Sequence, residues 1–158
     1  NRLSVELGCV EWLACEKASQ LNCTHAFSGS GADALFAGFD SFRNVLAVKG
    51  LEGVQDSILR RSMDWNKTDG NRLRVLASWF SLQVACPVMV APFLSDSLNV
   101  PVHEKIRSSD DSLRKHALRS LALKMGLPFA LALQSKKALQ YGSGASKLLA
   151  RLRRVRAV

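Results

Sequence analysis

One segment near the amino-terminus constrains the fold more than any other part of the sequence. A short β-prone run, residues 24–27, stops abruptly at the Ser-Gly-Ser-Gly of 28–31, and residues 32–42 have the apolar spacing of a helix. A helix is also predicted from Ser4 to Asn22, where apolar side chains recur every three to four positions. The order helix, strand, glycine turn, helix is typical of an α/β layered domain, whose binding sites lie at the carboxyl ends of strands. The sequence therefore predicts an α/β fold with a candidate site at the glycine turn.

Most of the remaining chain is predicted to be helical. The apolar spacing of residues 51–82 indicates two helices separated near residues 66–70, and a last helix is predicted from Ser143 to Arg156. The segment 86–101 contains three prolines, each of which disfavours helix in the residue before it. This segment is predicted to be a loop or short extended structure.

A further helix is predicted to begin at two consecutive acids. Asp110 and Asp111 are favourable at the positive end of a helix, and the apolar pattern runs on to about Met125. Gly126 and Pro128 are expected to end this helix.

Composition indicates a chain that can form a core and that has no membrane-spanning segment. The 158 residues are 47% hydrophobic, which is enough for a core. The longest run without a charged or strongly polar residue, 84–94, has 11 residues, whereas a membrane-spanning helix needs about 20. No transmembrane segment is therefore expected.

Cysteine usage indicates the cellular compartment, and the first residue indicates processing of the N-terminus. The four cysteines form no C-x-x-C pair, which favours reduced thiols in an intracellular protein of the cytoplasm or the mitochondrial matrix. A metal site at Cys23 and His25 lacks a second paired motif. The sequence begins at Asn1 without a signal-peptide pattern, so a processed or trimmed N-terminus is expected.

Charge is distributed very unevenly along the chain. Residues 1–111 hold 11 basic and 13 acidic side chains, whereas residues 112–158 hold 11 basic and no acidic ones. Aromatic residues in the basic part are limited to Phe129 and Tyr141, which argues against a surface that stacks nucleic-acid bases. Docking on RNA or on an acidic protein subunit stays open. The residues expected to dock, called here the C-terminal basic cluster, are Lys147, Arg151, Arg153, Arg154 and Arg156.

The glycine turn has the residue types of an anion site. Glycines between a strand and a helix can direct backbone N–H groups towards an anion, and the helix N-terminus adds partial positive charge. Asp33, in the first helical turn, is a candidate ligand for a magnesium ion bound to that anion. Alternatively, Asp33 only neutralises the helix N-terminus and the glycines only form a tight turn. The segment matches neither G-x-G-x-x-G nor the Walker loop, so the local sequence leaves both interpretations open.

A second candidate segment, residues 134–149, contains a lysine pair. Lys136 and Lys137 precede a second Gly-Ser-Gly turn at residues 142–144. A lysine held near a phosphate or a developing oxyanion stabilises charge that appears in a transition state. The alternative is a solvated basic helix end.

The two segments and the residues between them resemble the asparagine synthetase family. FSGSGADALFAGF, residues 27–39, resembles the family's S-G-x-G-A-D-E-L-F-x-G-Y, which belongs to the second conserved loop of its ATP-pyrophosphatase domain. Residues 134–142 resemble R-x-K-K-A-x-Q-Y-G. Four stretches between them resemble other family motifs in the same order: 71–74 resembles N-L-x-R-D-D, 91–95 resembles R-x-P-F-L-D, Pro101 with Lys105 resembles l-P…K, and 112–127 resembles K-x-x-L-R-x-x-A…L-G-L-P. The chain looks closest to the archaeal and eukaryotic asparagine-synthetase-like proteins.

The resemblance implies a fold, a reaction and a set of site residues. The fold would be a mostly helical C-terminal part of an adenine-nucleotide α-hydrolase-like (ATP-pyrophosphatase) domain, one partial domain over residues 1–158. The family reaction is amidation of aspartate with ATP and Mg²⁺ through β-aspartyl-AMP. By position, Lys136 would stabilise the adenylation transition state and Asp33 would hold magnesium. The turn residues Ser28, Gly29, Ser30 and Gly31, with Lys137, would lie beside ATP or pyrophosphate, and Asn71 and Arg74 would shape the site.

Departures from the family pattern point to weakened or lost catalysis. Each of six positions lacks a charge that the family has or often has: Ser30, Ala34, Val75, Leu76, Ser95 and Gln134. The family's first phosphate loop, S-G-G-x-D-S, and its glutaminase domain do not occur in these residues. We therefore expect that this chain alone cannot make asparagine, and that another chain or an upstream domain would supply these elements. The alternative is a non-catalytic synthetase-like subunit with a structural or docking role in a larger assembly, such as a mitochondrial or RNA-containing one.

Overall fold

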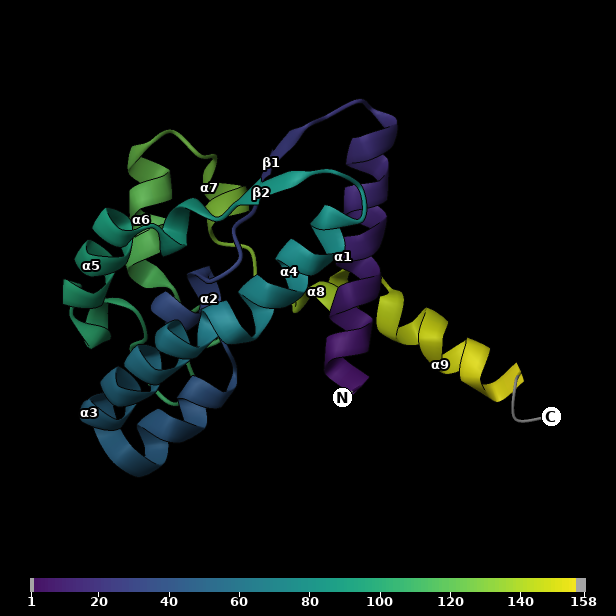
Figure 1. Ribbon diagram of the computed structural model, residues 1–158. Coiled ribbons are helices and arrows are strands. Elements are labelled where there is room, and N and C mark those ends of the chain that lie inside the picture. Colours follow the sequence, from purple (N-terminus) through teal and green to yellow (C-terminus); the bar gives the residue numbers. More distant parts are fainter. Residues whose placement is uncertain (1, 156–158) are drawn as a thin grey trace. The chain divides into compact units, whose positions relative to one another are not determined.

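The computed structural model describes residues 2–155, and the side chains of residues 2–152 (Figure 1). Helices make up most of these residues, together with a two-stranded parallel sheet. The chain divides into two compact units, each described here by itself. The terminal unit consists of Asn1–Phe27, Asn71–Ala85 and Lys137–Val158, and the central unit consists of Ser28–Gly70 and Cys86–Lys136. The ATP-pyrophosphatase fold and the single partial domain stay predictions.

The terminal unit contains the sheet. β1 (His25–Phe27) pairs in parallel with β2 (Gln83–Ala85), with Ala26 opposite Val84 (Figure 1). Parallel strands need a long connection between them, and here residues 28–82 provide it. The strand β1 confirms the predicted β-prone run, whereas β2, which is equally short, was not predicted.

Helices and a small apolar core complete the terminal unit. Its helices are α1 (Arg2–Gln20), most of α4 (Asp69–Ser78), α8 (Leu139–Gly142) and α9 (Ala145–Val155). Buried Cys15, Ala77 and Leu82 form the core, against which Ala26 and Val84 of the two strands pack. The helix predicted over 4–22 is confirmed as α1, and the last predicted helix is confirmed as α9; Arg156 lies outside the described residues.

The central unit is built on two helical stretches that meet at Gly50. Both carry the label α3 (Ser41–Asp64), but Gly50 between them is not helical, because its φ of 64° and ψ of −165° interrupt the helix in a conformation that only glycine adopts readily. Phe42, Val54 and Ile58 of α3 are fully buried together with Ile106. The other elements of this unit are α2 (Ala32–Leu35), the 3-10 helices η1 (Trp65–Lys67), η2 (Pro87–Met89) and η3 (Val102–Glu104), and the helices α5 (Ala91–Asn99), α6 (His116–Lys124) and α7 (Phe129–Ala132). The predicted separation near 66–70 is confirmed, because α3 ends at Asp64 and α4 begins at Asp69.

The prediction of one helix over residues 32–42 is wrong. α2 ends at Leu35, and Ala37 has a φ of 51°. The N–H of Gly38 donates to the carbonyl oxygen of Asp33 (2.8 Å), and a Cβ at residue 38 would collide with Asp33. Residues 34–37 are apolar because the turn buries all of them, so their pattern indicated a longer helix than the chain forms.

The prediction of a loop over residues 86–101 is also wrong. Residues 91–99 form the helix α5, and Pro92 lies in its first turn. A proline there costs little, because the first N–H groups of a helix have no partner within it. Pro87 occupies the corresponding place in η2.

The helix predicted from Asp110 begins later. α6 starts at His116, because Arg114 and Lys115 have φ values of 49° and 55° and no helix can pass through them. The Asp111 carboxylate instead accepts hydrogen bonds from the backbone N–H groups of Arg107, Leu113 and Arg114, at 3.0, 3.0 and 2.9 Å. The predicted end is confirmed: α6 stops at Lys124, and Gly126 follows with a φ of 92°.

Candidate functional site

The glycine turn is fixed by its own serines and by a buried tryptophan. The Ser30 N–H donates to the Ser28 hydroxyl (3.2 Å), and the indole N–H of Trp65 donates to the Ser30 hydroxyl (3.1 Å). Trp65 is buried, so the turn is held against the end of α3. Both serine hydroxyls therefore have a structural contact.

Glycine is required at the last position of this turn. Gly31 has a φ of 100°, in the left-handed region, and a Cβ there would collide with the Met89 side chain. The helix that follows, α2, has only four residues. The partial positive charge expected from a longer helix N-terminus is correspondingly small, so attraction of an anion would have to come from side chains.

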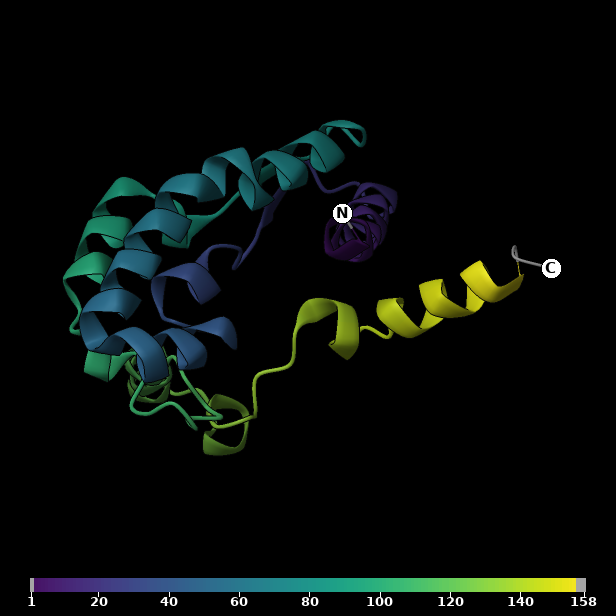
Figure 2. The ribbon, with the colours of Figure 1, turned by 90° about the horizontal axis from the view of Figure 1, so that it is seen from below.

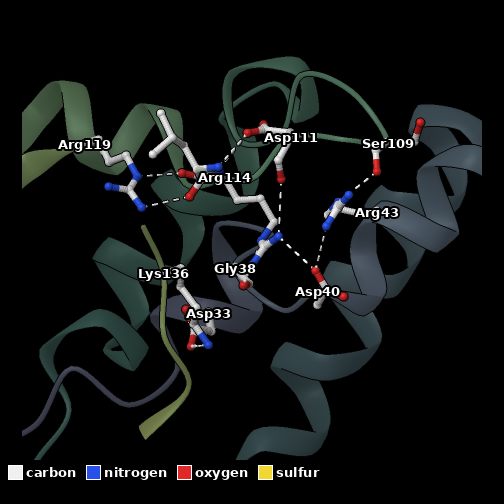
Figure 3. A network of polar contacts seen from close by, with 10 residues as sticks. Asp33, Gly38, Asp40, Arg43, Ser109, Asp111, Arg114, Arg119 and Lys136 are labelled. Atoms are coloured by element: carbon white, nitrogen blue, oxygen red, sulfur yellow. Dashed lines mark hydrogen bonds and ion pairs between the residues drawn. The ribbon is translucent and has the colours of Figure 1, made fainter. Parts of the chain in front are cut away.

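Two lysines near the turn supply positive side-chain charge, and the Asp33 carboxylate lies between them. Lys115 Nζ lies 3.0 Å from Asp33 Oδ1, and Lys136 Nζ lies 3.1 Å from Asp33 Oδ2. Figure 3 shows Lys136 beside Asp33. All three side chains are less than a third exposed, so water screens the cluster only in part. Two ammonium groups against one carboxylate leave a net positive charge beside the glycine turn.

The environment keeps Asp33 ionised. Burial alone would raise the pKa of this carboxyl, but attraction by Lys115 and Lys136, with a hydrogen bond from each, outweighs it and lowers the pKa below 3.8. Lys136 Nζ also lies 5.8 Å from the centre of the Phe39 ring, whose face attracts a cation.

A buried arginine connects the segment of Lys115 to the turn after α2. Arg114 is 5% exposed, and its Nε donates to the Gly38 carbonyl oxygen at 3.1 Å. Its Nη1 lies 3.1 Å from Asp40 Oδ1, and Figure 3 shows the guanidinium reaching both residues. Because Gly38 packs on Asp33, these contacts place the Lys115 backbone next to the carboxylate.

A second arginine, on α6, holds the two lysine-bearing segments together. Arg119 donates through Nη2 to the carbonyl oxygen of Leu113 (2.8 Å) and through Nε to that of Arg114 (2.8 Å). Figure 3 shows Arg119 beside Arg114. Through Nη1 it donates to the carbonyl oxygens of Ala132 and, at 2.9 Å, of Gln134. One side chain therefore fixes the chain just before Lys115 and just before Lys136.

Another lysine of the central unit is buried without a counter-charge. Lys105 is fully buried, and within the described residues its Nζ has no hydrogen-bond partner. The Nζ lies 5.9 Å from the centre of the Phe36 ring. Burial lowers the pKa of this amine from 10.5 to about 8.

The structure brings together part of the predicted site. Ser28, Gly29, Ser30, Gly31, Asp33 and Lys136 all lie in the central unit, although Lys136 is far from the others in sequence. Lys137, Asn71 and Arg74 belong to the terminal unit, and their roles stay predictions. Of the C-terminal basic cluster, Lys147 and Arg151 are exposed on α9; the side chains of Arg153 and Arg154 and all of Arg156 lie outside the described residues.

Sequence reasoning missed Lys115, Arg114 and Arg119. No sequence signal placed Lys115 at the site, because the helix was predicted to begin at Asp110 and Lys115 fell inside it. The two arginines bind mainly backbone carbonyl groups, and no sequence spacing indicates such contacts.

The donor set at Asp33 suits an anion better than a resident metal ion. The described residues include no cluster of three or more His, Cys, Asp or Glu side chains that could hold a metal. The Asp33 carboxylate is already neutralised by two ammonium groups, so it does not fit a resident magnesium ion in this arrangement. Its magnesium role stays a prediction. In the part of the chain that the structure covers, no helix is both long and apolar enough to cross a membrane.

Comparison with known proteins gives one informative similarity. No protein-family model matches the chain. The chain is 22% identical over 176 aligned residues to the putative asparagine synthetase (glutamine-hydrolyzing) 1 of Methanocaldococcus jannaschii. The similarity covers 93% of this chain and 32% of that protein, so the chain spans about a third of the relative's length. The chain is thus asparagine-synthetase-like at the level of a distant similarity.

Proposed function

We propose that this chain is the synthetase part of an asparagine-synthetase-like protein, with an ATP-pyrophosphatase-like fold, and that Asp33, Lys115 and Lys136 form a phosphate-binding cluster. The observation that carries the proposal is the contact of Lys136 with Asp33 at 3.1 Å. These residues come from two segments that are far apart in sequence and that each resemble a motif of the same family. The ligand would be the phosphate chain of ATP, or the pyrophosphate that adenylation releases.

The charges of the cluster support binding of a polyanion. Two partly buried ammonium groups contact Asp33, two residues after the glycine turn, and the space beside Gly29 in that turn is open. In such a site a phosphate oxygen experiences stronger attraction than in bulk water. Asp33 keeps the two lysines together while no anion is present, and an incoming phosphate would compete with it.

The proposed chemical role belongs to Lys136. Adenylation of a carboxylate expels pyrophosphate, and a positioned ammonium group stabilises the negative charge that grows on it. By resemblance the substrate is aspartate and the intermediate is β-aspartyl-AMP. No step proposed here depends on a metal ion at Asp33.

Pyrophosphate binding to the full chain tests the proposal. Isothermal titration calorimetry at low salt is expected to show binding that weakens about tenfold or more in Lys136→Ala and in Lys115→Ala, since each removes one of two cations. Lys124→Ala removes an exposed lysine at the end of α6 and serves as the matched control. Equal affinity in all four proteins would contradict the assignment of the cluster.

The non-catalytic alternative draws support from the same site. Each carboxylate oxygen of Asp33 already contacts a lysine ammonium group. The described residues also include no cluster of acids that could hold a metal ion. We expect the isolated chain to bind pyrophosphate but to release none from Mg-ATP in response to aspartate. Aspartate-dependent release of pyrophosphate by the isolated chain would rule out the non-catalytic alternative.

A further inference from the structure

The terminal unit contains an apolar groove that the proposed function does not use. The groove has a volume of about 640 Å³ and is lined by residues of α1 and α9, by the turn before α9 and by one residue of α4. Figure 2 shows the two helices, α1 nearly end-on and α9 in yellow. The side chains that define it are Val5, Trp12, Leu13, Leu76, Leu148 and Leu149. Every residue of its lining belongs to the terminal unit, whereas the phosphate-binding cluster belongs to the central unit.

Large apolar side chains on the walls of the groove are exposed. Leu13 and Leu148, on its two walls, are 59% and 58% exposed. On α9, Leu152 follows Leu148 by one helical turn and is also more than half exposed. Exposed apolar side chains that line a groove make it a candidate interaction surface.

The terminal unit that contains the groove has a positive net charge. The terminal unit has ten basic and three acidic side chains, a net charge of +7, whereas the central unit has twelve and ten, a net charge of +2. Two of the three acids are held in ion pairs: Glu6 with Arg2 and Glu11 with Arg72, each at 2.7 Å. Lys147 and Arg151 are exposed, one turn apart on α9, and directly precede Leu148 and Leu152. A partner that covers the leucines would therefore place its flank beside these two cations.

The shape of the groove favours a helix over other occupants. A concave channel between two helices accepts the ridge of a third helix, in which apolar residues recur at i, i+3, i+4 and i+7. A membrane surface would instead need an apolar face that projects outward. The lining contains one aromatic residue, Trp12, too few for stacking of successive bases.

We infer that this groove binds an amphipathic helix of a partner protein, with leucine-type side chains in the groove and acidic side chains beside Lys147 and Arg151. The inference is independent of the phosphate-binding cluster, because the two sites share no residue.

A designed peptide tests the inference on the full chain. The probe is a fluorescein-labelled helical peptide with leucine at i, i+3, i+4 and i+7 and glutamate at the other positions. Fluorescence anisotropy is expected to show saturable binding, weakened at least about tenfold in Leu148→Gln and in the double variant Lys147→Glu/Arg151→Glu. Met63→Gln, an exposed apolar residue of the central unit, and Lys49→Glu/Arg60→Glu, exposed on α3, are the matched controls and should bind like the unaltered chain. Circular dichroism checks that every variant is folded.

Several outcomes would overturn the inference. If a peptide with lysine in place of glutamate binds equally well, charge does not contribute to binding. If Leu148→Gln binds the original peptide as well as the unaltered chain does, the groove is not the binding site. Binding of the chain to phosphatidylserine vesicles or to an RNA oligonucleotide, without peptide binding, would assign the surface to a membrane or to nucleic acid. Self-association lost in Leu148→Gln, again without peptide binding, would assign it to a second copy of the chain.

Discussion

The two lysines at Asp33 act as a pair because one carboxylate holds both of them. Without the carboxylate, which lies about 3 Å from each of them, the two ammonium groups would repel each other. The same carboxylate is a competitor for any anion that approaches the lysines. Asp33 thus stabilises the site in the absence of ligand and weakens it towards phosphate.

Replacing Asp33 separates these two effects. Asp33→Asn is expected to lower the free energy of unfolding by about 1–2 kcal/mol, because it leaves two facing cations. In magnesium-free buffer the same variant should bind pyrophosphate about 3- to 10-fold more tightly, because the competing carboxylate is gone. Urea unfolding and calorimetry measure the two quantities. If Asp33 holds magnesium instead, the variant will bind pyrophosphate more weakly when Mg²⁺ is present.

Acid should remove the contribution of Asp33 to stability. The pKa of this carboxyl is lowered in the folded chain, so its stabilising contribution is present above pH 3.8 and is lost as the pH falls through the folded value. Asp33→Asn should therefore lose less stability than the unaltered chain between pH 5 and the acid limit of folding. Parallel acid titrations of stability for the two proteins would contradict the ion pairs at Asp33.

Lys105 should affect stability in alkali. Its pKa is about 8 in the folded chain and 10.5 in a freely exposed lysine, so between these values the unfolded chain binds more protons. Stability contributed by this group therefore rises with pH over that window, by about 3 kcal/mol in total. Lys105→Met should flatten the rise in urea titrations at pH 8 and pH 10. An identical rise in both proteins would show that the amine is not buried.

At the scale of elements, Arg119 decides where Lys136 lies. Its guanidinium joins α6 to the residues that follow α7 and to the turn that precedes α6, through carbonyl oxygens rather than side chains. A lysine could not replace it, because an ammonium group lacks the planar fork that reaches several acceptors at once.

Arg119→Lys should therefore loosen the segment that carries Lys136. Hydrogen exchange of backbone amides in residues 131–136 is expected to become about tenfold faster or more, while exchange in the middle of α3 stays unchanged. Pyrophosphate affinity should fall in the same variant, although Arg119 itself does not contact Asp33. Unchanged exchange in both segments would show that Arg119 does not position the lysine.

Elements were predictable from sequence where the pattern was long and regular. α1 and the break between α3 and α4 follow from apolar periodicity, and Asp33 and Lys136 were identified through motif resemblance. Short elements show no period, so four-residue α2 and three-residue β2 were missed; the equally short β1 was found because the glycine turn at residues 28–31 ends it abruptly. Lys115 reaches Asp33 from a left-handed backbone conformation, which a non-glycine residue seldom adopts and which has no sequence signature.

At the scale of the whole molecule, the two proposed sites belong to separate units. The phosphate-binding cluster lies in the central unit and the apolar groove in the terminal unit. Changes in one site should therefore leave binding at the other intact. Leu148→Gln is expected to bind pyrophosphate with unchanged affinity, and Lys136→Ala to bind the acidic peptide with unchanged affinity. Loss of both activities in either folded variant would show that the sites are coupled.

The interleaving of the two units also sets an order of folding during synthesis. β1 is made before residue 28, but its partner β2 ends at Ala85, so the sheet cannot form until the first segment of the central unit has been made. Packing of α9 against α1 is delayed further, because α9 is made after the second segment of the central unit. During that interval Trp12 and Leu13 lack the apolar neighbours that α9 later supplies, so this face of the first helix is open to aggregation until α9 has been made.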